Sequence, residues 1–273
     1  MIDKTIAIYT FIDELLKFLN HKDDKKRKLS DAEVLTTAII SALYFGGHLD
    51  NARSFMYSTK LMPNMLSKSR FNRRLHGIGE RITLLFLEIG EHIKQVATCH
   101  NFIIDSFPVE VCDNIRISRS KLIKGEEYRG WKASMRRYFY GIKVQLLTTS
   151  SGIPVEFCFA PGSQADIKGL HQLPLNLEQG SVLYADAAYT DYQIEDMLSQ
   201  EGIQLRSDRK ANSHRKDAPW VVYLKGAIRK RIETSISEIK ALFLRKIHAV
   251  TLRGFLIKIL LFLLAFQLNK ALL

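Results

Sequence analysis

Residues 138–159 read YFYGIKVQLLTTSSGIPVEFCF, and this stretch decides the fold. Two apolar runs rich in β-branched and aromatic residues, 138–149 and 153–159, are separated by Ser150, Ser151 and Gly152. Runs of this composition that are bounded by small turn residues are typical of strands joined by a hairpin. The stretch therefore predicts an antiparallel pair of strands.

The segments on both sides of this hairpin extend it into a larger sheet. The run FIIDS at 102–106 predicts a strand that ends in a carboxylate, and SVLYAD at 181–186 predicts another. Antiparallel strands followed by alternating helices and strands indicate a mixed α/β sheet flanked by helices. The remaining expected elements are helices at 166–175, 190–201 and 227–243 and a strand at 203–207.

Residues 1–98 predict a small all-helical domain in front of the sheet domain of residues 99–273. Ser30 and Glu33 have the spacing of a capping box at the start of one helix. A basic helix containing Arg70 and Arg73 fits a helix-turn-helix DNA-binding module, and a plain helical bundle with a solvated basic face stays an equal alternative. The helices are expected at 6–19, 34–44, 52–57, 67–75 and 81–96.

Positive charge is abundant and concentrated. The 273 residues include 40 Lys and Arg against 28 Asp and Glu, a net charge of +12, and 47% are hydrophobic, which excludes disordered, collagen-like and fibrous chains. Residues 116–143 and 206–231 each hold nine basic and two acidic residues, a net of +7. Aromatic residues interleave the first segment, so both segments favour nucleic-acid binding over a merely solvated surface.

The cysteines and the two ends of the chain indicate the cellular compartment in which the protein is expected. Cys99, Cys112 and Cys158 fit neither a disulfide framework nor a zinc site, which favours a reducing, cytosolic compartment. The N-terminus lacks the pattern of a signal peptide. The apolar segment 254–266 is too short for a clean membrane span, so it is expected to form a buried terminal helix packed on a sheet.

Three acids have the positions needed for metal binding. Asp105 and Asp186 each end an apolar strand, and Glu233 lies on the helix 227–243 beside a core stripe. Carboxylates that converge repel one another unless hard divalent cations lie between them. Two such ions can activate an attacking oxygen and stabilise the leaving oxygen of a phosphodiester. Taken singly, each acid could instead be a turn or capping residue or an ion-pair partner, so their mutual distance, roughly 4–7 Å for two-metal chemistry, is the discriminating test.

At these residues the chain resembles a DDE transposase of a bacterial insertion sequence, and it is most similar to the family of insertion sequence 982. The resemblance is carried by a helical N-terminal module and by five segments: FIIDSFPV, YFYGIKVQLLTTSSGIPVEF, ADIKGL, VLYADAAYTD and RKRIETSISEIK. It implies a ribonuclease-H-like catalytic core in which Asp105, Asp186 and Glu233 bind two Mg²⁺ or Mn²⁺ ions. Asp166 looks like a family position that is not a metal ligand.

The chain also resembles, in part, the Tyr–Arg–Glu–Lys signature of the related insertion-sequence-4 group. The last three residues of that signature match Arg229, Glu233 and Lys240. Gly226 stands where that signature has Tyr, and Tyr223 comes three residues early, so this part departs from the pattern. The competing acids Asp113 and Asp191 lie near the trio in sequence. The histidines show no paired metal spacing and are left structural or on the surface: His48, His76, His171 and His214.

The implied activity is cleavage of DNA at the transposon ends and transfer of the freed strand to target DNA. The implied partner is double-stranded DNA, with the protein acting as a homodimer or larger assembly in the cytoplasm, at the nucleoid and away from membranes. The open alternatives are a catalytically inactive DNA-binding protein derived from a mobile element and a general ribonuclease-H-like nuclease. The expected DNA contacts are Lys143, Arg229, Lys240, Arg136, Arg137, Arg70 and Arg73.

Overall fold

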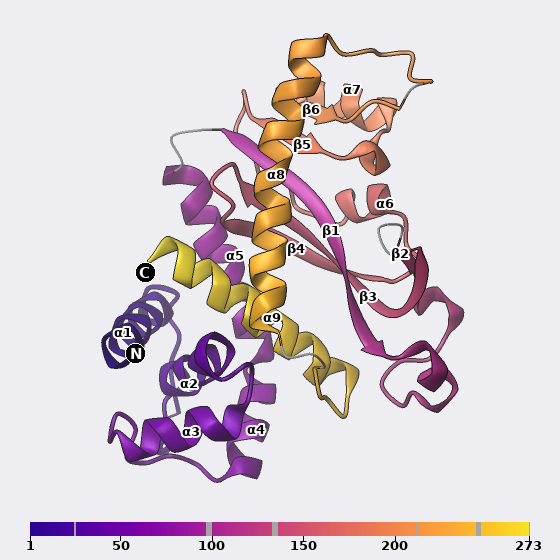
Figure 1. Ribbon diagram of the computed structural model, residues 1–273. Coiled ribbons are helices and arrows are strands. Elements are labelled where there is room, and N and C mark those ends of the chain that lie inside the picture. Colours follow the sequence, from indigo (N-terminus) through magenta and orange to yellow (C-terminus); the bar gives the residue numbers. More distant parts are fainter. Residues whose placement is uncertain (25, 97–99, 133–135, 211, 244–246, 273) are drawn as a thin grey trace. The chain divides into compact units, whose positions relative to one another are not determined.

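The computed structural model describes residues 1–24, 26–96, 100–132, 136–210, 212–243 and 247–272. Cys99 and the predicted boundary between residues 98 and 99 lie outside this part of the chain. The chain forms two compact units (Figure 1): unit 1 contains Met1–Phe86 and Ile239–Leu273, and unit 2 contains Leu87–Glu238. These units divide the chain differently from the predicted ranges of 1–98 and 99–273, which stay a prediction about functional domains.

Unit 1 is helical. Its predicted capping box is confirmed: Ser30 Oγ accepts a hydrogen bond from Glu33 N at 3.1 Å, and Ser30 N donates to Glu33 Oε2 at 2.6 Å. Five helices of the N-terminal region lie close to their predicted positions. They are α1 (Ile2–Phe18), α2 (Asp31–Tyr44), α3 (Leu49–Ser58), α4 (Lys68–Gly77) and α5 (Gly79–Val96), the last of which continues into unit 2.

The C-terminal helix α9 (Leu252–Ala271) is buried as expected, but it does not pack on a sheet. It packs among the helices of unit 1, where Gln267 Nε2 donates to Phe86 O at 3.1 Å. Among the described helices, α9 is long and apolar enough to cross a membrane, and 72% of its most apolar window is buried inside the protein. Its apolar surface is therefore used as core.

Unit 2 is built on a six-stranded mixed sheet in the order β2-β3-β1-β5-β6, with β4 also paired to β3. The antiparallel half contains β2, β3, β4 and β1, and β1 is also the first of three parallel strands with β5 and β6. The predicted hairpin is thus confirmed as β3 and β4. The strands are β1 (Asn101–Cys112), β2 (Arg129–Lys132), β3 (Arg137–Thr149), β4 (Pro154–Pro161), β5 (Val182–Ala185) and β6 (Gln204–Ser207).

Helices cover the sheet and complete its core. In Figure 1 the long helix α8 runs along the sheet, and Arg231 Nε and Ser235 Oγ donate to the carbonyls of Ser151 and Gly152 in the β3–β4 turn, at 2.7 and 2.9 Å. On α8 the predicted apolar stripe is buried at Ile232, Ile236 and Ile239. Besides the end of α5, the described helices of unit 2 are α6 (Asp166–Leu170), α7 (Tyr192–Gln200) and all but the last turn of α8 (Pro219–Leu242), and short 3-10 segments lie at η1 (Asn114–Arg119), η2 (Glu126–Tyr128) and η4 (Ala187–Tyr189).

Three elements differ from their predicted ranges. Strand β1 continues past residue 106 because it keeps pairing with β3 as far as Cys112. Helix α6 stops at Leu170 instead of 175, four residues before Pro174, which has no backbone N–H and constrains the residue before it. Helix α8 begins at Pro219 instead of 227, with proline in the first helical position, where its missing N–H costs nothing.

Candidate active site

Parallel pairing brings Asp105 and Asp186 to matching positions. Ile103 on β1 is the register partner of Tyr184 on β5, and each acid lies two residues further along its strand direction. Because both acids lie two residues beyond a register pair of neighbouring parallel strands, they occupy adjacent positions. Asp105 was predicted to end its strand, and this prediction is wrong. Asp105 lies within β1, at the point where β1 stops pairing with β5 while its pairing with β3 continues.

The backbone holds one oxygen of each carboxylate. Asp105 Oδ1 accepts from Ser106 N at 2.7 Å, and Asp186 Oδ1 accepts from Ala188 N at 2.8 Å as the cap of η4. The capping role that sequence reasoning left open for Asp186 is thus real. Within the described part of the chain the second oxygen of each acid accepts no hydrogen bond, so it can accept another ligand.

Burial and neighbouring carboxylates raise the proton affinity of both acids. Burial, chiefly, together with the charges of Asp186 and Asp166, raises the pKa of Asp105 to about 7, against the opposing effects of the Ser106 N–H and Arg229. Burial also raises the pKa of Asp186, with Asp166 and Asp208 acting in the same direction and Arg229 opposing it. Carboxylates held together in a partly dry site favour either a proton or a cation between them.

Asp166 borders the pair and is held firmly. Its Oδ1 accepts from Ser106 Oγ at 2.7 Å, Lys143 Nζ at 3.0 Å and Gln145 Nε2 at 3.2 Å. Gln145 in turn accepts a hydrogen bond from the buried hydroxyl of Tyr189. Since its oxygen already has three donors, Asp166 acts on Asp105 mainly through its charge, and Lys143 is engaged with this acid as well as with the carbonyl of Gln164 at 2.9 Å.

Arg229 connects the acids with α8. Its guanidinium opposes the rise in the pKa of both Asp105 and Asp186, and it forms an ion pair with Asp208, the residue that follows β6. Arg229 Nη2 also lies 3.6 Å from Glu233 Oε1. Asp208 was not singled out from the sequence, although it directly follows the predicted strand 203–207, as Asp186 follows the strand before it.

Glu233 lies on an exposed part of α8. Its side chain is 59% exposed and has Arg229 as its ion-pair partner. Among the described residues, Asp105, Asp186 and Glu233 do not form a group whose ligand atoms all lie within 4.8 Å of one another. The structure therefore brings two of the three acids together and links the third to them through Arg229.

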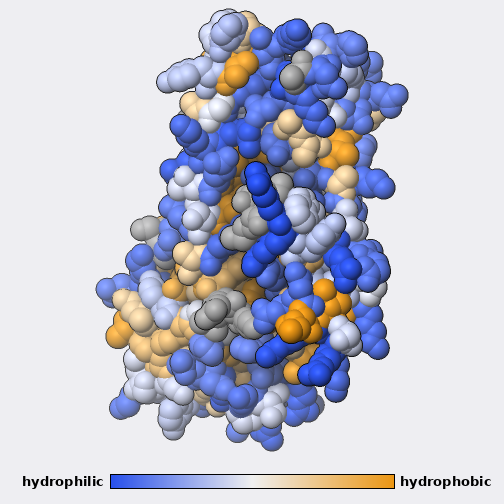
Figure 2. All heavy atoms as spheres, turned by 45° about the vertical axis from the view of Figure 1, so that its right-hand side comes forward, coloured by the Kyte–Doolittle hydropathy of each residue, from blue (hydrophilic) through white to orange (hydrophobic). Residues whose placement is uncertain are grey.

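The other predicted DNA contacts lie on the surface of both units. Arg136 and Arg137 are exposed next to β2, with Arg137 paired to Glu110 at 3.0 Å. Arg70 and Arg73 are exposed on α4, and Lys240 is exposed on α8. Figure 2 shows that hydrophilic side chains dominate the end of unit 2 that carries α7 and the start of α8, which is the upper part of the view.

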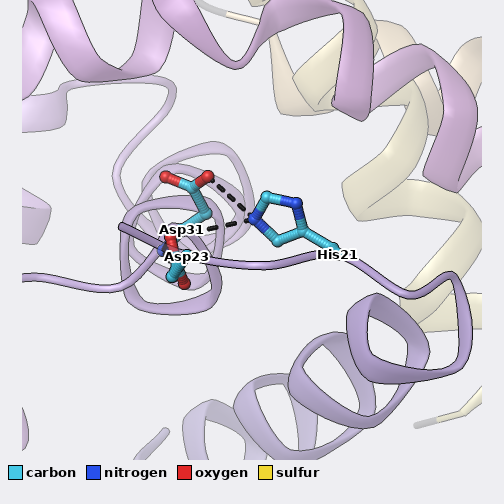
Figure 3. A group of neighbouring side chains, drawn as sticks. All are labelled: His21, Asp23 and Asp31. Carbon is cyan, nitrogen blue, oxygen red and sulfur yellow. Dashed lines mark hydrogen bonds and ion pairs between the residues drawn. The ribbon is translucent and has the colours of Figure 1, made fainter. Parts of the chain in front are cut away.

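A second group of potential metal ligands lies in unit 1. The ring of His21 faces the carboxylates of Asp23 and Asp31, as Figure 3 shows, with Nε2 at 3.1 Å from Asp31 Oδ2 and 3.7 Å from Asp23 Oδ1. Asp31 is fully buried, and it is also paired with Arg74 and with Arg27, the latter at 3.4 Å. Arginines already balance this carboxylate, so the group is an ion-pair network that ties the start of α2 to α4.

The raised proton affinity of Asp105 makes folding stability depend on pH. The folded pKa of about 7 lies above the ordinary 3.8, so the contribution to stability is present at low pH and is lost as the pH rises through about 7. Asp105→Asn cannot ionise and keeps the acceptor for Ser106 N. At pH 8 without divalent cations it is expected to be more stable than the unmodified protein by a few kcal/mol, at about 1.4 kcal/mol per tenfold difference in proton affinity. Urea denaturation at pH 5 and pH 8 measures this, and a stability difference that does not shrink at pH 5 contradicts it.

Comparison with known proteins identifies the family. The family described as "Transposase DDE domain" matches residues 101–268, which is more than half of the chain. The curated proteins include no match. One similar solved structure is the cryo-EM structure of the piggyBac transposase synaptic complex with hairpin DNA, with 11% identity, a TM-score of 0.50 and coverage of 96% of this chain and 70% of that one. Another is the Mos1 transposase paired-end complex with left transposon end, with 10% identity, a TM-score of 0.26 and coverage of 80% and 81%.

At this identity the piggyBac likeness shows a shared fold, while the family match covers the whole sheet and the helix that carries Glu233. The protein therefore belongs to the DDE transposases, enzymes that cleave and transfer DNA with the help of divalent metal ions.

Proposed function

We propose that this transposase cleaves and transfers the strands of a bacterial insertion sequence, of the kind typified by insertion sequence 982, by two-metal-ion chemistry. The observation that carries the proposal is the pair Asp105 and Asp186, which parallel pairing places at matching positions and whose pKa values are raised together. Unit 2 is proposed to be a ribonuclease-H-like core, with the antiparallel strands preceding the parallel ones in the chain.

The acids suit Mg²⁺ or Mn²⁺. Both ions prefer oxygen ligands, and Asp105 and Asp186 each have one oxygen fixed by a backbone N–H and the other oxygen without a hydrogen bond within the described part of the chain. When bound, such ions activate an attacking oxygen and stabilise the leaving oxygen of a phosphodiester. Glu233 is proposed as the third ligand, which requires it to exchange its ion pair with Arg229 for the cation.

The cations around the acids are proposed to hold DNA. Lys143 and Arg229 border the acidic pair and would contact the phosphates nearest the reacting bond, and Lys240 follows on the same helix as Arg229. Arg136 and Arg137 would extend this contact along the sheet, while the exposed arginines of α4 would contribute to recognition of the transposon ends. Contacts of this kind supply affinity that falls steeply with salt.

The proposed partner is double-stranded DNA, both transposon ends and target, bound by a homodimer or larger assembly in the cytoplasm at the nucleoid. The similar piggyBac transposase structure is a synaptic complex with hairpin DNA, which supports DNA as the partner here. The rival function is a DNA-binding protein from a mobile element that has lost catalysis. It predicts DNA binding that ignores divalent cations.

A cell-free reaction separates the two. The substrate is a plasmid carrying the genomic DNA that flanks this coding sequence, and strand cleavage and joining are followed on gels. We expect products with Mg²⁺ or Mn²⁺ and none with EDTA, whereas duplex binding should persist in EDTA. Binding without cleavage under every cation tested would favour the rival.

A further inference from the structure

We propose that Trp131 and Tyr138 form a platform on which unpaired DNA bases stack. The proposal rests on the function proposed above and concerns a surface of unit 2 other than the acidic site. The two residues are register partners on β2 and β3, with ring centroids 4.8 Å apart and planes at 68°. Both are about half exposed, at 51% and 56%.

Aromatic side chains of this size are normally buried, because contact of their apolar surface with water costs free energy in proportion to its area. Here the packing of neighbouring residues on β2 and β3 keeps the rings of Trp131 and Tyr138 exposed. Phe139, between Tyr138 and Tyr140 in sequence, is buried on the opposite face. Gly130 leaves no room for a side chain, since a Cβ there would lie 2.2 Å from Gly162 O and 2.4 Å from the Phe139 ring. Strand β2 is thus held close to the core, and its aromatic face is directed outward.

The charge around the two rings identifies the occupant. Arg129 and Lys132 lie on the same short strand as Trp131, and Arg136 and Arg137 precede Tyr138. Acids partly balance Arg129 and Arg137, through Glu126 at 3.5 Å and Glu110 at 3.0 Å. The described side chains of Lys132 and Arg136 have no acidic partner within 4.0 Å.

Two more cations, both exposed, lie on a segment that is hydrogen-bonded to β3. Asn114 Nδ2 donates to Tyr138 O at 2.8 Å, and the segment η1 that Asn114 begins carries Arg116 and Arg119 on the surface. Aromatic rings among surplus cations suit a polyanion whose bases present flat π faces. That combination is typical of single-stranded nucleic-acid binding, in which cations contact the backbone and rings stack on bases.

Stacking needs an unpaired base, because the faces of paired bases are covered by their neighbours in the duplex. The proposed occupant is therefore the single-stranded or splayed end of a DNA strand. Strand cleavage at a transposon end would produce such an end. A protein partner is disfavoured by the net positive charge of segment 116–143.

Tryptophan fluorescence tests contact directly. The chain has two tryptophans, so in Trp220→Phe the signal comes from Trp131 alone. Titration with a single-stranded oligothymidine should quench this signal, and a blunt duplex of equal length should quench it much less. Trp131→Ala and Tyr138→Ala should each weaken oligothymidine binding by about 5- to 100-fold, the range that loss of one base–aromatic stack gives. Trp131→Phe should retain most of the affinity.

Salt separates stacking from phosphate contact. Trp131→Ala should lower affinity without changing the slope of log K against log salt, whereas Arg136→Ala should reduce that slope by about 0.7. Phe18→Ala, which removes an aromatic side chain that is 78% exposed on α1, is the matched control and should change nothing. An unquenched Trp131 with unchanged affinity of the alanine variants overturns the platform. If duplex binding and cleavage persist in that case, the proposed function stands; if the unmodified protein binds no DNA at all, both fail.

Discussion

Asp105→Asn and Asp186→Asn are each expected to reduce strand cleavage and joining by about 10³-fold or more. Asparagine keeps the size of the side chain and the acceptor for the Ser106 or Ala188 N–H, so the local backbone should be unchanged. It removes the negative charge that would hold a divalent cation. The bound cation would supply several kcal/mol of transition-state stabilisation. Each 1.4 kcal/mol or so corresponds to a tenfold change in rate.

The readout is the cell-free reaction with Mg²⁺, together with thermal melting in the presence and absence of Mg²⁺. The ion should raise the melting temperature of the unmodified protein and have little effect on either variant, because a ligand that binds only the folded state stabilises it. Asp191→Asn is the matched control. Asp191 lies close to Asp186 in the chain, two residues after η4, but its carboxylate caps α7 by accepting from Gln193 N and Ile194 N, a role that asparagine preserves.

The variant Glu233→Gln tests whether Glu233 is the third metal ligand beside Asp105 and Asp186. If Glu233 binds the cation, the variant should lose activity to the same degree as the two aspartate variants. If Glu233 only pairs with Arg229 on the surface of α8, the variant should retain most of its activity, since an exposed pair contributes little. Full activity in the Asp105 or Asp186 variant would remove that residue from the catalytic set.

The largest effect on stability is expected at the buried ion pair of Lys94 and Glu156. Lys94 on α5 is 6% exposed and Glu156 on β4 is 2% exposed. Lys94 Nζ donates to Glu156 Oε1 and to Asn176 O, both at 2.9 Å, and Glu156 Oε2 accepts from Leu175 N at 3.0 Å. Lys94→Met leaves the carboxylate buried without its cation, which is expected to cost about 3–5 kcal/mol of unfolding free energy.

Urea denaturation of both single variants and of the double variant tests this. Lys94→Met with Glu156→Leu should lose less than either single change, because no uncompensated charge stays buried. Lys17→Met is the control: Lys17 pairs with Asp13 and Glu14 on the exposed surface of α1, so no measurable change is expected. Equal losses in the single and double variants would show that the pair contributes through packing alone.

Local patterns in the sequence were sufficient for elements whose residues interact with near neighbours. The hairpin of β3 and β4 and the capping box of α2 depend on contacts within a few residues, so composition and spacing identify them. The apolar stripe of α8 could be predicted for the same reason. The stripe did not determine how exposed Glu233 is. Successive residues on a helix differ in direction by about 100°, so a residue next to a buried one can point to solvent.

Other features depend on partners distant in the chain. Strand β2 has only four residues and exists because Arg129–Lys132 pairs with the start of β3. The sequence showed an apolar helix at the C-terminus but not its partner, and α9 proved to pack with helices instead of a sheet. Burial of an apolar surface is non-directional, so the sequence specifies that it must be covered without specifying by what.

The sequence by itself determined the mixed sheet, the helical N-terminal region, the excess of positive charge and the two strands that carry Asp105 and Asp186. Only the tertiary structure decided that these acids take matching positions on neighbouring parallel strands, that Asp166, Asp208 and Arg229 join them, and that Glu233 is linked through Arg229. The physical reason is that hydrophobic periodicity and turn chemistry act over a few residues, whereas strand register and electrostatic coupling can join distant parts of the chain, such as Ser106 and Asp166, which are 60 residues apart.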